Sequence, residues 1–397
     1  MQAGKKWNIG FTLVVSILLS SPISSIAANS QTPSWIIPDN VRIVQQDHTD
    51  GVKSFPSISA AVTSLGTPTS RSLIKIMPGT YTDNVTLPNN IDLVGSGEEG
   101  TIITSTSGTV LTTSTGSNTV EKLTITSTGN YEAVDIPANG TATLRNTVIN
   151  VSTTGYNPAI YAHAGTALNF INSKLVQNGN IESLGMELQG NSFIMENCTV
   201  TGTLSVGSPF VIDSGVTDMK IINSSFDLKY TGTGSVTAFG ASSTTKLLVS
   251  NSRIVIDNGT GGRFSGLTIK SECEIRDSYI EVKGGNALAQ SAIDVNSGNL
   301  NLINSTVVSG YDGIRNGSKV TVANSNVSAT ANGIAGSQDL TVTNSVVSGG
   351  TAGITKTTGE SFKIGNSQLI GGYTGAETGI DKVFNCYDAV FASVPSP

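Results

Sequence analysis

The stretch LTVTNSVVSGGTAGI at residues 340–354 nearly repeats the stretch VTVANSNVSATANGI, which lies twenty residues earlier at 320–334. In both stretches apolar and polar residues alternate around an Asn-Ser pair, and a small residue precedes the final Ile. Alternation at every second residue is typical of a strand that buries one face. Recurrence of the whole unit at a fixed interval predicts a structural unit that stacks on copies of itself.

The repeat extends over most of the chain in two registers that advance together. The first register is an Asn, or once an Asp, and its members are Asn146, Asn172, Asn197, Asn223, Asn251, Asp277, Asn304, Asn324, Asn344 and Asn366. The second register is a small residue before an apolar one, and its small residues are Ala133, Ala159, Gly185, Ala238, Gly266, Ala292, Gly313, Gly333 and Gly353. Units of 20 to 28 residues have room for two or three short strands but not for an additional helix.

This repeat predicts an all-β fold, a single-stranded right-handed parallel β-helix, which is a solenoid of about a dozen coils. Asn tolerates the left-handed backbone conformation that a sharp turn between strands demands. We therefore expect each repeated Asn to occupy a corner of its coil. The stacked Asn side chains are expected to hydrogen-bond from coil to coil as a ladder.

The N-terminus has the pattern of a secretory signal peptide. Two lysines precede an apolar segment of 12 residues at 9–20, and Ser25 and Ala27 are small residues suited to cleavage. The apolar segment is shorter than the roughly 20 residues of a membrane-spanning helix. We therefore expect removal of residues 1–27, no membrane span afterwards, and secretion to the periplasm or the extracellular space.

The mature chain is expected to be one domain, a β-helix with a cap at its N-terminal end and a cap at its C-terminal end. Residues 55–65 place Ile58, Ala61, Val62 and Leu65 at helical spacing, which predicts a short capping helix. The predicted segments are 1–27 signal peptide, 28–72 N-terminal cap with its helix, 73–381 β-helix, and 382–397 C-terminal cap or tail.

Charge and cysteine content exclude several classes of protein. The net charge of −6 and the absence of a dense Lys/Arg cluster argue against a nucleic-acid partner. The three cysteines Cys198, Cys273 and Cys386 form neither a disulfide framework nor a metal site, because their number is odd and no His lies near. We expect no metal and no cofactor, and we expect Cys198 and Cys273 to be small buried apolar groups.

Residues 55–104, which include FPSISAAVTSLG and LIKIMPGTYTDNVTLPNNIDLVGSGEEGTIIT, resemble the opening of bacterial and plant pectin methylesterases. That family consists of secreted right-handed parallel β-helices of the pectin-lyase-like class. The resemblance implies an Asp nucleophile, an Asp acid/base, two Gln that hold the oxyanion, and an Arg that orients the nucleophile, all on one outward-facing sheet.

The matching positions of this chain carry other residues. Glu132 stands at an oxyanion Gln, and a carboxylate cannot donate the hydrogen bond that an amide donates. Pro158 and Ala159 stand where the second Gln and the acid/base Asp belong, and Gly185 or Met186 stands at the nucleophile. No Leu-Gly-Arg-Pro-Trp element occurs. We therefore predict a member of this fold class without pectin methylesterase activity.

The residue after each small-apolar pair is expected to point outward on one sheet in every coil. This outer column is predicted to contain Asp135, Tyr161, Glu187, either Ile212 or Asp213, Gly240, Thr268, Asp294, Arg315, Ala335 and Thr355. Asp294 and Arg315 are expected to form a surface ion pair. His163 is expected to be exposed, without a partner in its coil.

Tyr161 between two carboxylates is a place where a sugar ring could rest, so Tyr161, Glu132, Asp135 and Glu187 are the predicted substrate-binding residues. Asp135 and Glu187 are also the candidate catalytic pair, because two strand spacings of about 4.8 Å put them about 9.6 Å apart, at the wide edge of the separation in an inverting glycosidase. Isolated carboxylates on a solvated strand face are, however, ordinary.

The sequence favours a secreted protein that binds or scaffolds at a polysaccharide or cell-surface glycan. Two alternatives stay open: a carbohydrate-active enzyme, either a pectinesterase-like esterase or a polysaccharide hydrolase or lyase, and an adhesin or fibre component. The sequence does not decide the ligand or the oligomeric state.

Overall fold

A computed structural model divides the chain into two units, residues 1–37 and residues 38–397. The residues that the structure describes are 40–47, 49–152, 157–181, 185–204, 210–212, 215–231, 236–240, 243–258, 264–284, 291–336, 338–356, 361–375 and 380–384. The predicted signal peptide, the aromatic residues Tyr387 and Phe391 of the predicted C-terminal cap, and Cys386 all lie outside them.

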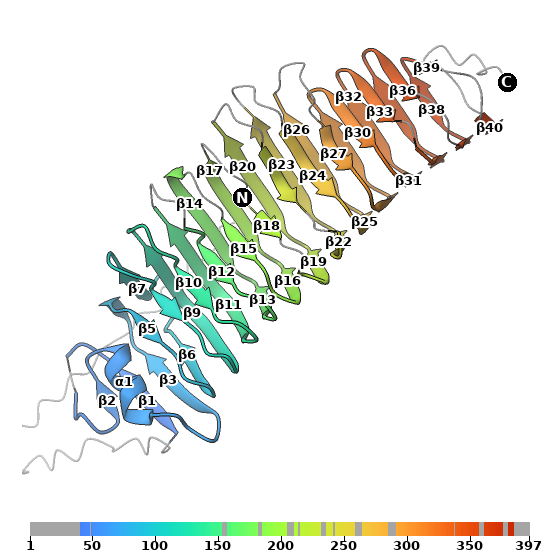
Figure 1. The fold of residues 1–397 in the computed structure, drawn as a ribbon. Helices are drawn as coiled ribbons and strands as arrows, with labels where there is room; N and C mark the ends of the chain where they lie inside the picture. Colours follow the sequence, from blue (N-terminus) through green and yellow to red (C-terminus); the bar gives the residue numbers. More distant parts are fainter. Residues whose placement is uncertain are drawn as a thin grey trace, which may run out of the picture. The chain divides into compact units, whose positions relative to one another are not determined.

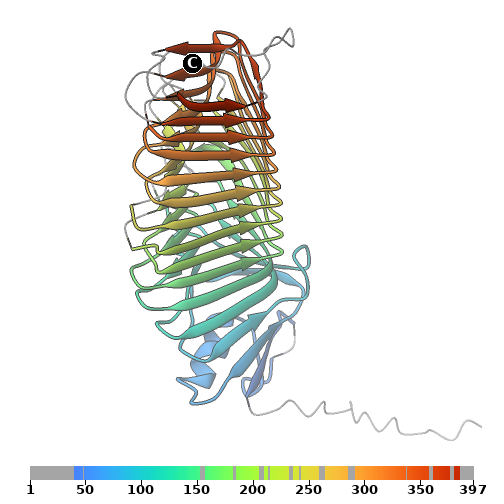
Figure 2. The same ribbon diagram turned by 90° about the vertical axis from the view of Figure 1, so that its right-hand side faces the viewer.

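Each central coil contains three short strands. One coil is made of β12 (Ile160–Ala162), β13 (Ala167–Ile171) and β14 (Lys174–Ile181). These strands pair in parallel with β15 (Met186–Leu188), β16 (Ser192–Glu196) and β17 (Thr199–Leu204) of the next coil. The coils follow one another in sequence order along the stack (Figures 1 and 2). The predicted right-handed parallel β-helix is confirmed.

The first strands of the coils form a 13-stranded sheet, called sheet B here. Its remaining strands are β5 (Val85–Thr86), β8 (Leu111–Thr112), β10 (Val134–Ile136), β18 (Phe210–Ile212), β21 (Val236–Gly240), β24 (Phe264–Ile269), β27 (Ser291–Val295), β30 (Asp312–Asn316), β33 (Asn332–Gly336), β36 (Ala352–Lys356) and β39 (Tyr373–Gly375). Thirteen strands in one sheet agree with the prediction of about a dozen coils.

The other strands form a 27-stranded sheet, called sheet A, with two rows that meet at the corner of the repeated Asn. The row before the corner contains β1 (Val41–Val44), β3 (Ser72–Ile76), β6 (Ile91–Val94), β13, β16, β19 (Asp218–Ile222), β22 (Lys246–Ser250), β25 (Glu272–Arg276), β28 (Asn299–Ile303), β31 (Lys319–Ala323), β34 (Leu340–Thr343), β37 (Phe362–Gly365) and β40 (Ile380–Phe384). The row after the corner contains β4 (Gly79–Thr82), β7 (Thr101–Ser105), β14, β17, β20 (Ser225–Tyr230), β23 (Arg253–Asn258), β26 (Tyr279–Lys283), β29 (Thr306–Ser309), β32 (Asn326–Ala329), β35 (Val346–Gly349) and β38 (Gln368–Ile370). The long strands β9 (Ser117–Ser127) and β11 (Thr141–Val151) run through both rows, and β2 (Ser54–Phe55) pairs with β1.

A short helix packs at the N-terminal end of the described stack. This helix, α1 (Ile58–Leu65), begins after Ser57, whose hydroxyl accepts a hydrogen bond from the backbone N–H of Ala60. Such a cap satisfies one of the N–H groups that the first helical turn leaves without a partner. Ile58 and Ala61 are fully buried against the strands, as their spacing predicts. In the described part of the chain, no helix is long and apolar enough to cross a membrane.

The repeated Asn residues have the backbone conformation that the sequence predicts. All nine of them, and Asp277 in the tenth place, have φ between 47° and 55°. Side-chain rungs also occur: the Asn197 amide donates to Asn172 at 3.0 Å, and the Asn304 amide donates to Asp277 at 3.3 Å. Asn is suited to this corner because it enters the left-handed region at a smaller cost than most residues.

A second ladder runs beside the Asn residues and is buried. We call it the serine ladder, and its members are Ser173, Ser224, Ser252, Ser278, Ser305, Ser325, Ser345 and Ser367. At a typical rung, the Ser278 hydroxyl accepts from the backbone N–H of Ser252 at 3.1 Å and donates to the carbonyl of Arg276 at 2.7 Å. The sequence predicts a ladder of Asn amides, and the buried serine ladder was not predicted. The hydroxyls satisfy backbone groups at the corner that the strand pairing leaves unpaired.

Cys198 occupies one position of this ladder. Its thiol lies 3.1 Å from the carbonyl oxygen of Phe170, and its backbone N–H donates to the hydroxyl of Ser224. Burial raises the pKa of the Cys198 thiol to about 11. Cys198 and Cys273 are both free and buried, as predicted. Cys198 is more than a small apolar group, because it substitutes for a serine in the hydrogen-bonded series.

The interior between the sheets is filled by apolar side chains, including an aromatic cluster in the middle coils. Phe210 and Phe239 stack with ring centroids 4.5 Å apart, and Phe226 meets Phe239 edge-on at 5.0 Å. In the later coils, steric crowding explains why a small residue stands near the start of each sheet B strand. A Cβ atom on Gly313 would lie 2.5 Å from the carbonyl oxygen of Gly333.

Candidate functional site

The outer face of sheet B brings three predicted site residues together. Asp135 in β10 is the register partner of Tyr161 in β12, and Tyr161 is the partner of Glu187 in β15. Their side chains are partly exposed, whereas both neighbours of each along its strand are buried. Strict alternation along short strands therefore produces an outward column of Asp, Tyr and Glu from three successive coils.

One position of the predicted outer column was wrong. The partner of Glu187 in the next coil is Val211, and neither Ile212 nor Asp213. Ile212 is buried at 5% exposure because it lies one residue later and faces the interior. Asp213 lies outside the described residues. Gly240, Thr268, Asp294 and Arg315 follow in register, as predicted, but Thr268 is buried, at 8% exposure.

His163 has a partner that the sequence analysis did not find. Its Nε2 atom lies 2.9 Å from Oδ1 of Asp135, which belongs to the preceding coil. When Asp135 is ionised it can only accept hydrogen bonds, so Nε2 then carries the proton in this contact. The imidazole ring also packs on the ring of Tyr161, with centroids 4.0 Å apart. The expectation that His163 has no partner considered its own coil alone, and the stacking supplies the carboxylate from the coil before.

Burial and charge act in opposite directions on Asp135. Its pKa is raised above the ordinary value, because partial burial disfavours the charged carboxylate and Glu132 adds a second negative charge. The charge of His163 and its hydrogen bond lower the same pKa but do not cancel the burial effect. Asp135 is thus a partly desolvated carboxyl held in place by an imidazole.

The other two carboxylates of this surface have hydrogen-bond donors from neighbouring side chains. The Gln189 amide donates to Oε1 of Glu187 at 2.9 Å, and the Thr109 hydroxyl donates to Oε2 of Glu132 at 2.9 Å. We call the surface formed by Glu132, Asp135, Tyr161, His163, Glu187 and Gln189 the β12 patch. It combines an aromatic ring, an imidazole, an amide and three carboxylates within three coils.

A second polar group lies farther along the same sheet. Asp294 and Arg315 are register partners, as predicted, but no N–O contact within 4.0 Å joins these two described residues. Burial raises the pKa of Asp294, and the charge of Arg315 opposes the shift. The nearby Asp312 is 6% exposed and accepts a hydrogen bond from the Asn332 amide at 2.8 Å.

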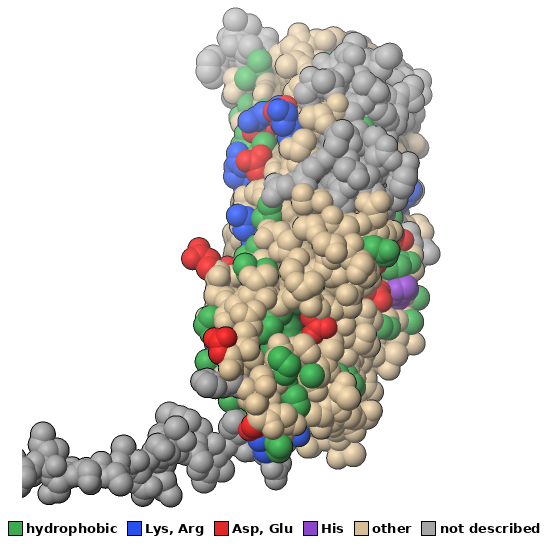
Figure 3. All heavy atoms as spheres, turned by 90° about the vertical axis from the view of Figure 1, so that its left-hand side faces the viewer, with side chains coloured by type: hydrophobic (Ala, Val, Ile, Leu, Met, Phe, Trp, Pro, Cys, Tyr) green, Lys and Arg blue, Asp and Glu red, His purple; other side chains and the backbone are tan. Residues whose placement is uncertain are grey.

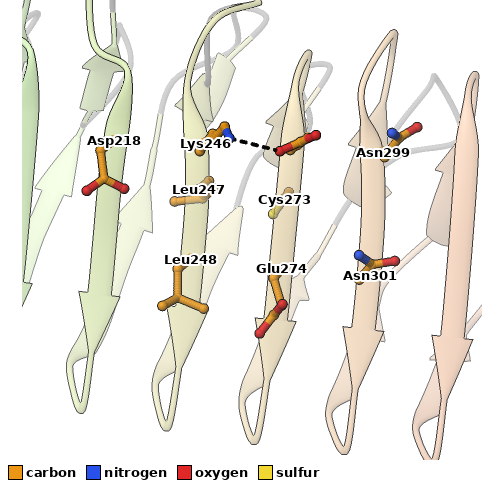
Figure 4. A pocket seen from close by; sticks show the side chains of 9 residues that line it. Asp218, Lys246, Leu247, Leu248, Cys273, Glu274, Asn299 and Asn301 are labelled. Atoms are coloured by element: carbon orange, nitrogen blue, oxygen red, sulfur yellow. Dashed lines mark ion pairs between the residues drawn. The ribbon is translucent and has the colours of Figure 1, made fainter.

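Sheet A has a shallow hollow of about 440 Å³ over β19, β22, β25 and β28 (Figure 4). Asp218, Lys246, Leu248, Glu274 and Asn301 line it, together with Glu272, which pairs with Lys246 at 3.5 Å. Both members of this ion pair are more than 60% exposed, so the pair contributes about 0–1 kcal/mol. The hollow has no aromatic residue, and its lysine offsets part of its negative charge.

The space-filling view shows how sparse charge is on one face of the molecule (Figure 3). Most of the described part of that face is uncharged, Asp and Glu side chains are scattered over it, and several Lys and Arg side chains lie along one edge. Within the part of the chain that the structure describes, no three His, Cys, Asp or Glu side chains converge in a way that could hold a metal ion.

No family model matches the chain, and no curated protein matches it. Several solved structures are similar to it. Pectin methylesterase PemA from Erwinia chrysanthemi is 13% identical over 65% of this chain and 89% of its own, with a TM-score of 0.37. The A-module of the mannuronan C-5 epimerase AlgE6 from Azotobacter vinelandii is 11% identical over 83% and 93%, with a TM-score of 0.42. The catalytic unit of a GH87 α-1,3-glucanase from Streptomyces thermodiastaticus strain HF3-3 is 14% identical over 88% and 69%, with a TM-score of 0.46.

Proposed function

We propose that the protein is secreted and binds a polysaccharide or cell-surface glycan at the β12 patch, without pectin methylesterase activity. The observation that supports binding is the outward register of Asp135, Tyr161 and Glu187. An aromatic ring between hydrogen-bond acceptors suits a sugar, because the ring covers the apolar face of a pyranose while the carboxylates accept from its hydroxyls. The contact between Tyr161 and His163 holds the aromatic surface in place.

The parallel strands favour an extended ligand over a small enclosed one. Sheet B presents one outward residue per coil at intervals of about 4.8 Å, so its described strands form a long track of outward positions. A chain of sugars can contact successive coils along that track. A small metabolite would need a concave cavity that surrounds most of its surface.

The test is calorimetric titration of the chain without residues 1–27 against glycans that bind on a saccharide array. Tyr161→Ala is expected to weaken binding at least tenfold, which corresponds to about 1.4 kcal/mol. The matched control is Tyr279→Ala, which removes a partly exposed tyrosine from sheet A. It is expected to leave the affinity unchanged. Equal losses in both variants, or no saccharide binding at all, would contradict the proposal, and the second result would favour the adhesin or fibre alternative.

Catalysis on a bound glycan is the second candidate function, and the contact between His163 and Asp135 favours it. An imidazole that is fixed by a carboxylate is suited to general acid-base chemistry near neutral pH. If the protein is an enzyme, His163→Gln and Glu187→Gln will each abolish turnover of a bound polysaccharide. If it only binds, the wild-type chain will release no product from any glycan that it retains.

A further inference from the structure

We infer that the β12 patch selects glycan chains without anionic groups, either neutral or amino-substituted, and discriminates against polyuronates. This inference rests on the proposed function and names the ligand class of the same site. The observation behind it is the distribution of charge along the outer column of sheet B.

The patch has three carboxylates and no lysine or arginine. Glu132 and Asp135 come from the coil of β10 and Glu187 from the coil of β15, two coils later, and His163 is the only side chain of the patch that can become a cation. The described outer-column residues around it are Thr86, Thr112, Val211, Gly240 and Thr268. None of them supplies a positive charge to a bound anion.

The first arginine of the outer column lies too far away to offset the negative charge of the β12 patch. Arg315 in β30 is six strands beyond Tyr161 in β12, which is about 29 Å at the usual strand spacing. The Debye length at physiological ionic strength is about 8 Å, so Arg315 has little effect on a charge at the patch. A uronate placed on Tyr161 would therefore face Asp135 and Glu187, and among the described residues of the patch and the outer column only His163 could supply a counter-charge.

Hydrogen-bonding capacity leads to the same class of ligand. Ionised carboxylates only accept, so they match hydroxyl or ammonium donors and cannot bond to a second carboxylate. One donor already occupies Oε1 of Glu187 and one occupies Oε2 of Glu132, and each group keeps further lone pairs for a ligand. Asp135 is already partly desolvated, as its raised pKa indicates, and a nearby anion would raise the cost of its charge further.

The test compares two forms of one glycan that differ only in charge. The tightest neutral oligosaccharide of the panel is titrated beside its C6-oxidised form, in which the primary hydroxyls are carboxylates. At low ionic strength the neutral form is expected to bind at least tenfold more tightly, and the difference is expected to shrink in 1 M salt, because salt screens the repulsion. An amino-substituted oligosaccharide is expected to bind at least as tightly as the neutral one.

Charge-neutral variants assign the effect to the patch. Glu132→Gln and Glu187→Gln together are expected to reduce the ratio between the neutral and oxidised forms at least threefold. Glu272→Gln, which removes the same charge from sheet A, is expected to leave the ratio unchanged. Binding of the oxidised form that equals or exceeds that of the neutral form overturns the inference while the proposed function stands. Absence of binding to every glycan overturns both.

Discussion

The corner of sheet A has the same residue in most described coils, whereas the residue on the outer face of sheet B varies from coil to coil. At the corner, nine described coils have Asn in the same left-handed conformation, and Lys122 and Asp277 take its place in two others. A buried hydroxyl follows the Asn in most of the nine. On the outer face of sheet B, three successive coils present Asp135, Tyr161 and Glu187. The comparison teaches that the same residue type recurs at a position where every coil requires the same backbone conformation. A position that faces only solvent or a ligand is free to vary, and the proposed site lies where the repeated residue changes from coil to coil.

The largest expected effect comes from breaking the corner. Ser278→Ala leaves the buried N–H of Ser252 without an acceptor, which costs about 1–3 kcal/mol of unfolding free energy. Chemical denaturation measures this loss. Ser328→Ala is the control, because Ser328 is partly exposed on the neighbouring row, and its replacement is expected to change stability by less than about 0.5 kcal/mol. Equal effects of the two changes would show that the serine ladder does not stabilise the fold.

On the variable face, the expected effect is local. His163→Ala removes both the charge and the hydrogen bond that lower the pKa of Asp135, so that pKa should rise further. Titration of the Asp135 carboxyl carbon by nuclear magnetic resonance measures the shift. A fall in the pKa, or no change, would mean that the contact between His163 and Asp135 is not formed in solution. The fold should be unchanged, since neither residue belongs to the ladder.

A smaller effect is expected in the pH dependence of stability. Burial raises the pKa of Asp312 above 3.8, so the folded state binds this proton more tightly than the unfolded chain does. The resulting stabilisation is fully present below the unfolded value and is lost as pH rises through the raised folded value. Asp312→Asn removes this contribution, so wild type should lose stability relative to the variant as pH rises above 3.8. Urea unfolding of both chains across that range decides whether the difference has this sign.

The smallest effect is expected where one coil departs from the ladder. Cys198→Ser restores the usual hydroxyl and should change the unfolding free energy by less than about 0.5 kcal/mol. In the wild-type chain the Cys198 thiol, with a pKa of about 11, should resist alkylation at pH 8 while the protein is folded and should react after unfolding. Mass spectrometry of peptides from the two states checks this. Rapid labelling of Cys198 in the folded state would place it at an accessible surface and contradict its role in the ladder.

The sequence predicts the fold because one pattern recurs with little change. Period-two alternation and the Asn interval are enough to derive the coils, the left-handed corners and the outward positions of Asp135, Tyr161 and Glu187. The serine ladder was also visible, since Ser follows Asn in most units, but a hydroxyl at a turn is usually solvated, and only the stacking reveals its burial.

The features of the candidate site that the sequence does not predict are contacts between coils. The side chain of His163, just after β12, contacts Asp135 in the neighbouring strand β10 along a diagonal. The pattern within a single coil cannot reveal that pairing. The outer position of this coil was predicted at Ile212 or Asp213 instead of Val211, because the distance between the two registers is not constant in that coil. A slip of one residue along a strand moves a side chain to the other face.

The most direct test of the account is a crystal structure of the chain without residues 1–27, bound to the oligosaccharide for which it has the highest affinity. The account predicts a sugar ring packed on Tyr161, with hydroxyl groups that donate to Asp135 or Glu187 and with further sugars extended over adjacent strands of sheet B. A sugar bound in the hollow around Lys246 and Glu272 on sheet A, with Tyr161 uncovered, would contradict it.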